Sequence, residues 1–134
     1  MSPGEEGGEG ERVPYAYTVI RVVPRVEREE FVNVGVVLFS RPRKYLGVRM
    51  HLDPARLRAL WPDIDIEGVA RTLGTIQLVA AGDPGGGPIA ALPAAARFGW
   101  ISAPSSTVVQ PGPVHAGLTK DPEAAIEELY RKLV

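Results

Sequence analysis

Residues 17–39 read YTVIRVVPRVEREEFVNVGVVLF, and this stretch decides the fold. It contains two runs rich in Val, Ile, Tyr, Phe and Thr, which pack well on a pleated surface, so each run predicts a β-strand. The second run, Phe31–Ser40, is apolar on both faces, which indicates a central strand buried on both sides. Asn33 and Gly35 interrupt one face of it. A buried Asn needs hydrogen-bond partners, and a Gly inside a strand often marks a bulge.

Further strands are expected on both sides of this stretch. The first run should span residues 15–23, because Pro24 has no N–H to continue a strand ladder. Residues 45–52 alternate between inward apolar side chains and a second face that is solvated or binds something polar. That second face carries Tyr45, Gly47, Arg49 and His51. Two short strands are predicted at Phe98–Ser102 and Thr107–Gln110, between prolines.

Helices are predicted from capping residues and apolar spacing. Asp-Pro pairs at residues 53–54 and 121–122 match an N-cap carboxylate followed by a proline in the first helical turn. Another helix should begin near Asp63 or Asp65, and residues 89–96 should form a loop or a short helix. The order β-β-β-α-α-β-β-α with hairpin connections predicts an α+β fold, a mainly antiparallel sheet covered by helices.

Length and composition place the chain among single-domain globular proteins. It has 134 residues, of which 45% are hydrophobic and 23% charged. Residues 1–12 are rich in Gly and Glu and are expected to form a disordered tail, with one α+β domain over 13–134. The absence of cysteine excludes disulfides and thiolate metal sites. No apolar run is long enough to cross a bilayer and no signal-peptide pattern is present, so we expect a cytoplasmic protein.

A first polar cluster begins in the first strand and continues beyond it: Arg21, Arg25, Glu27, Arg28, Glu29, Glu30 and Asn33. An Arg inside an apolar strand needs a carboxylate or a phosphate, because burying an unpaired charge is very costly. In the structural interpretation, which we favour, Glu27 or Glu30 pairs with Arg21 and fixes the turn after Pro24. In the functional interpretation, Arg21 and Arg25 build an anion or nucleotide site.

A second polar cluster contains Arg97, Trp100, Ser106, Thr107 and His115. Hydroxyl, Arg and His side chains in loops near strand ends are typical of binding sites. A Ser/His/Asp triad with Asp121 is not supported, since there is no nucleophile elbow and Asp121 already serves as an N-cap. The only histidines, His51 and His115, are not spaced as metal ligands. We therefore expect neither a metal nor a cofactor.

A basic stripe runs along the second hairpin and into the following helix: Arg41, Arg43, Lys44, Arg49, Arg56 and Arg58. Such residues can follow a nucleic-acid backbone. The whole chain carries a net charge of only −1, however, and no nucleic-acid motif is present. A solvated face is therefore favoured over a nucleic-acid interface.

The block over residues 17–39 resembles a bacterial family known only as a domain of unknown function, number 3037. The same resemblance extends through residues 53–60, Arg97-Phe98 with Trp100, residues 103–107, and residues 113–118. It implies a genetic context, since such proteins are often encoded beside a HipA-like serine/threonine kinase. The polar positions that the resemblance singles out are Arg21, Arg25, Glu27, Glu30, Asn33, Arg97, Ser106, Thr107 and His115.

Three hypotheses on function follow. The first is a non-enzymatic partner or regulator, antitoxin-like, of a HipA-like kinase, because no nucleophile or metal constellation is present. The second is a small enzyme or nucleotide-binding domain that holds an anionic small ligand with Arg21, Arg25, Arg97 and His115. The third is nucleic-acid binding through the basic stripe.

Overall fold

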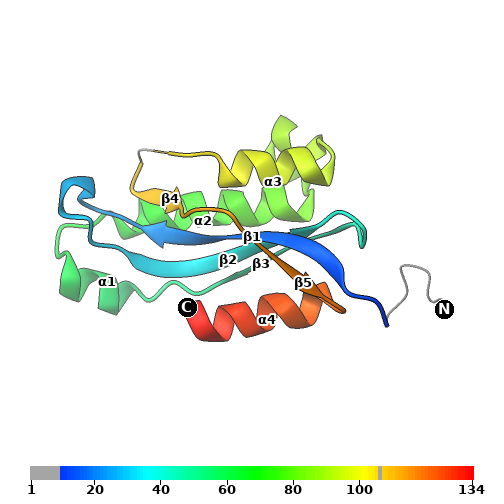
Figure 1. The fold of residues 1–134 in the computed structure, drawn as a ribbon. Coiled ribbons are helices and arrows are strands. Elements are labelled where there is room, and N and C mark those ends of the chain that lie inside the picture. The colour runs from blue at the N-terminus through cyan, green and yellow to red at the C-terminus, as the bar shows by residue number, and fades with distance from the viewer. Residues whose placement is uncertain (1–9, 106) are drawn as a thin grey trace.

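An antiparallel five-stranded sheet forms the centre of the structure, a computed structural model that describes residues 10–105 and 107–134. Helices cover both faces of this sheet: α2 and α3 lie on one face and α4 on the other (Figure 1). The strands are β1 (Val13–Val22), β2 (Val32–Ser40), β3 (Tyr45–Met50), β4 (Val109–Pro111) and β5 (His115–Thr119). The helices are α1 (Pro54–Leu60), α2 (Ile66–Ala81), α3 (Ala94–Ser102) and α4 (Pro122–Leu133). The predicted α+β class is confirmed. Most of the predicted disordered tail, residues 1–12, lies outside the described residues.

The β2 strand is central, as its sequence predicts. It pairs with β1 on one side and β3 on the other, while β4 and β5 both pair with the far edge of β1. Between β1 and β2 the register shifts, because Ile20 pairs with Gly35 but Arg21 pairs with Asn33. The bulge lies beside Gly35, where an added Cβ would meet the Met50 side chain and backbone of β3.

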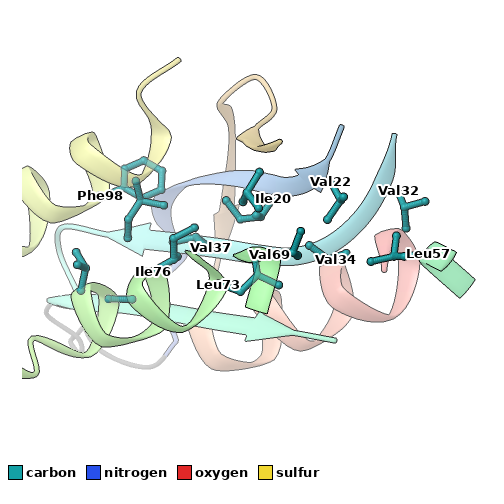
Figure 2. Close-up of a cluster of buried hydrophobic side chains, with 14 residues drawn as sticks. Ile20, Val22, Val32, Val34, Val37, Leu57, Val69, Leu73, Ile76 and Phe98 are labelled. Atoms are coloured by element: carbon teal, nitrogen blue, oxygen red, sulfur yellow. The ribbon is translucent and has the colours of Figure 1, made fainter. Parts of the chain in front are cut away.

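Two hydrophobic clusters hold the layers together. The larger one joins one sheet face to α2, α3 and Leu57 of α1 (Figure 2). The smaller one consists of Val36 and Leu38 of β2 with Ile126 of α4, and all three side chains are fully buried. The α4 helix therefore covers the face of β2 and β3 that lies opposite α2.

This arrangement corrects the expectation of a solvated or ligand-binding face on residues 45–51. Tyr45 packs against the cluster beneath α4. The Arg49 guanidinium forms ion pairs with Glu127, at 2.7 Å, and with Glu123 of the same helix. The polar residues on this face of β3 therefore dock a helix of the same chain.

Three aspartates cap helices, as the sequence predicts. The carboxylates of Asp53, Asp65 and Asp121 accept hydrogen bonds from backbone N–H groups of the first turns of α1, α2 and α4. In α1 and α4 a proline follows the cap directly. The caps of α1 and α4 lie where the chain leaves β3 and β5, and the cap of α2 follows α1.

The predicted strand at Phe98–Ser102 is wrong, because these residues form the end of α3. Phe98 and Ile101 both belong to the larger cluster. They are three residues apart, and this spacing places both side chains on one face of a helix. The Ser102 hydroxyl donates to the Phe98 carbonyl within the same helix. The predicted strand at 107–110 overlaps β4, and β5 was not predicted. Residues 89–96, predicted as a loop or short helix, contain the end of a 3₁₀ turn and the start of α3.

Candidate functional site

A groove of about 780 Å³ lies where the β1–β2 connection, the α1–α2 connection and the start of β4 meet. We call it the end groove. Three exposed apolar side chains line it: Phe31 is 46% exposed, Leu60 53% and Val108 40%. Trp61 and Ile64 add partly buried apolar surface. Large apolar side chains are scattered singly on most surfaces, so a hollow that gathers three of them is a candidate contact site.

Six charged residues also line the end groove. They are Arg25, Arg28, Glu29, Glu30, Asp63 and Asp65. Arg28 and Glu30 form an ion pair at 3.4 Å with both side chains about half exposed. Glu29 has a φ of 54°, in the left-handed region that non-glycine residues rarely occupy. The end groove therefore carries both signs of charge, contributed by the β1–β2 and α1–α2 connections.

The first predicted cluster is divided between two places. Arg25 and Glu30 line the end groove, and Glu27 is exposed on the 3₁₀ turn Val26–Arg28. Arg21 and Asn33 are cross-strand neighbours at the bulge between β1 and β2. The predicted pairing of Arg21 with Glu27 or Glu30 is wrong, since Glu30 pairs with Arg28 and no described carboxylate reaches Arg21.

Arg21 instead contacts an aromatic ring and a glycine. Its Cζ lies 4.2 Å from the centroid of the Phe31 ring, a cation–π contact. A Cβ added to Gly112 would come within 2.9 Å of Cζ, 3.0 Å of Nη2 and 3.1 Å of Nε. Near-equal distances to these three atoms mean that Gly112 faces the flat side of the guanidinium. Nε is buried and lacks a hydrogen-bond partner among the described residues.

Asn33 connects this corner to the last helix. Its Nδ2 donates to the Leu133 carbonyl at 3.0 Å, and so satisfies one of the free carbonyls at the end of α4. Its Oδ1 is buried and has no partner within the described part of the chain. Asn33, which the sequence predicts to be buried, is partly buried, and its amide group has one structural role at the end of α4.

The second predicted cluster is not gathered in one site. The Arg97 guanidinium donates to the backbone carbonyls of Leu92, Val79 and Ala80, where it ties α3 to the end of α2. Trp100 and Thr107 line a cavity of about 450 Å³ between α2, α3 and β4. His115 lies on β5, its ring 5.2 Å from that of Tyr17. Ser106 lies outside the described residues.

The basic stripe is partly used within the chain. Arg43 donates to the carbonyls of Lys120 and Glu11, and Arg49 pairs with two glutamates of α4. Beside Arg49, burial and then the nearby Glu123 raise the pKa of the Tyr45 phenol to about 12. The hydrogen bond that Arg49 donates to Glu127 is the main cause that raises the pKa of Arg49 above its ordinary value.

Sequence reasoning missed the residues that surround Arg21 and those that form the end groove. Phe31 reads as the first residue of a buried strand, but it precedes β2 and is exposed. Gly112, between two prolines, reads as a turn residue, and nothing local indicates that it touches Arg21. Leu60 and Trp61 read as the inner face of a helix, whereas Leu60 is exposed and only Leu57 of α1 is buried.

In the described residues, no group of three or more His, Asp or Glu side chains is arranged to hold a metal ion. Nor does any described helix combine the length and the apolar character needed to span a membrane.

Comparison with protein families supplies one match. The model of the family described as Protein of unknown function (DUF3037) matches residues 17–134. The chain belongs to this family. The match includes every described strand and helix, apart from the first four residues of β1. No curated protein and no solved structure matches the chain.

Proposed function

We propose that this DUF3037 protein is a non-enzymatic partner or regulator, antitoxin-like, of a HipA-like serine/threonine kinase, and that it contacts the kinase through the end groove. The observation that carries the proposal is the gathering of Phe31, Leu60 and Val108 in one hollow that charged residues also line. The kinase is named from the genetic context that the family resemblance implies.

The composition of the end groove is that of a protein-binding surface. Specific interfaces place apolar and aromatic anchors at the centre and polar groups at the rim. Each of the three apolar side chains is about half exposed, so covering it would contribute roughly 1 kcal/mol. The groove charges of both signs favour a matching acidic and basic surface on the partner and disfavour wrong partners.

Two observations weigh against the alternatives. An anion site built from Arg21, Arg25, Arg97 and His115 requires these side chains to converge, but Arg97 is held by three carbonyls and His115 lies against Tyr17. Nucleic-acid binding through the basic stripe requires free cations, but Arg49 is paired and Arg43 bonds backbone carbonyls.

The test is co-purification with the neighbouring kinase, followed by a phosphorylation assay. The proposal predicts a stable complex and a changed rate of kinase autophosphorylation when the purified chain is added. The absence of a complex, together with unchanged phosphorylation at a large excess of this chain, would contradict it.

A further inference from the structure

The Arg21 guanidinium is held flat before any ligand arrives. Phe31 lies directly before β2, which pairs with one edge of β1. Gly112 lies directly after β4, which pairs with the other edge of β1. The backbone of Gly112 is itself fixed, because its N–H donates to the Val19 carbonyl at 2.7 Å and its carbonyl accepts from the Thr18 hydroxyl at 2.8 Å. The planar group therefore lies between an aromatic ring and a rigid backbone segment, in a fixed orientation.

The outer edge of this guanidinium remains open. Nε is the one Arg21 nitrogen that is both buried and without a partner in the described residues. The two terminal nitrogens form no ion pair with any described carboxylate, and they are not among the buried atoms that lack partners. They consequently reach the surface with their N–H donors available, parallel to one another in the plane of the group.

We propose that Arg21 is the anchor of a binding site for a carboxylate group, held end-on by the two terminal nitrogens. A planar fork of two parallel donors matches the two oxygens of a carboxylate. One guanidinium balances one negative charge, so a carboxylate matches Arg21 better than a phosphate dianion does. The site goes beyond the proposed kinase partnership, and its test does not depend on that partnership.

The preorganisation explains why Gly occupies position 112. Any side chain there would press on Cζ, Nη2 and Nε and tilt the guanidinium away from the Phe31 ring. A prepositioned donor pair binds more tightly than a free Arg, because less side-chain freedom is lost on binding.

The experiment is a nuclear magnetic resonance titration of the arginine side-chain Nε–Hε signals. Sodium acetate replaces sodium chloride at constant ionic strength, and the Arg21 signal is identified by its absence in Arg21→Lys. Arg97, whose guanidinium already donates to three carbonyls, is the internal control. The proposal predicts that the Arg21 signal moves about threefold or more further per unit of acetate than the Arg97 signal.

A pair of glycine variants separates the site from general effects. Gly112→Ala should abolish the extra response of Arg21 while the fold is retained, as judged by the amide spectrum. Gly99→Ala is the matched control, since a Cβ at that position meets nothing within 4 Å, and it should leave the response unchanged.

A blocked tripeptide with one central glutamate distinguishes the source of the carboxylate. Stronger binding of the peptide than of acetate assigns it to a protein segment, and stronger binding of acetate assigns it to a small acid. Equal responses of Arg21 and Arg97 to both probes would overturn the site. A larger response to inorganic phosphate than to acetate would overturn the carboxylate assignment.

Discussion

Replacing Ile126 with alanine should destabilise the domain by about 3–4 kcal/mol. Ile126 is 0% exposed and packs with Val36 and Leu38, the fully buried centre of the cluster between α4 and the sheet in the described residues. The substitution removes three carbon atoms, which contribute about 2.4 kcal/mol at about 0.8 kcal/mol each. The cavity left behind accounts for the remainder, because the surrounding side chains relax only partly into the space that Ile126 leaves.

Urea unfolding followed by circular dichroism measures this loss. With an m-value of about 1–2 kcal/mol/M, the midpoint should fall by about 2 M. Leu118→Ala on β5 is the control: Leu118 is 61% exposed, so its substitution should change stability by no more than about 0.5 kcal/mol. A loss below about 1 kcal/mol for Ile126→Ala would refute the docking of α4 on β2.

Three further predictions address the centre of the sheet, the end of α2 and the pH response. Val36→Asp places an unpaired charge at a fully buried site of the central strand and should cost several kcal/mol, so a variant that melts at the wild-type temperature would contradict the burial. Arg97→Met removes three bonds to carbonyls and should lower the free energy of unfolding by about 2 kcal/mol in urea, whereas a purely ligand-binding Arg would leave it unchanged. Burial raises the pKa of Tyr45 from 10 to about 12, so the folded state keeps a neutral phenol that the unfolded chain loses above pH 10. Its contribution is therefore fully present below pH 10 and lost as pH rises towards 12, and the stability of Tyr45→Phe should fall less steeply over that range.

Much of the fold follows from local chemistry. The run from Val32 to Phe39 is apolar on both faces because β2 is covered by α2 and α3 on one side and by α4 on the other. The helix starts are predictable because a side-chain carboxylate satisfies N–H groups that the first turn leaves free. The carboxylates are those of Asp53, Asp65 and Asp121.

The errors arise where an element is decided by distant contacts. Phe98 and Trp100 suit a strand by their intrinsic preference, but packing of Phe98 and Ile101 against the sheet selects a helix. The polar face of β3 reads as solvated because the alternation of one strand cannot reveal that Glu123 and Glu127 of α4 will cover Arg49.

The candidate sites were harder to predict than the fold. The sequence indicates correctly that Arg21 is a charged residue in an apolar strand. It suggests that Arg21 pairs with the carboxylates nearest along the chain, Glu27 or Glu30. The structure supplies Phe31 and Gly112, the latter brought in by the pairing of β4 with β1. The end groove likewise joins three segments distant in sequence, and no periodicity within any one of them indicates the hollow.

The most direct test of the proposed partnership is the dissociation constant of the complex with the purified HipA-like kinase, measured by calorimetry for three forms of the chain. Leu60→Asp changes an exposed residue of the end groove, and Leu92→Asp changes one of similar exposure beyond the opposite end of α2. The proposal predicts that Leu60→Asp weakens binding about tenfold or more, a cost of about 1.4 kcal/mol, while Leu92→Asp binds like the wild type. Equal affinities for all three forms, or a loss confined to Leu92→Asp, would contradict it.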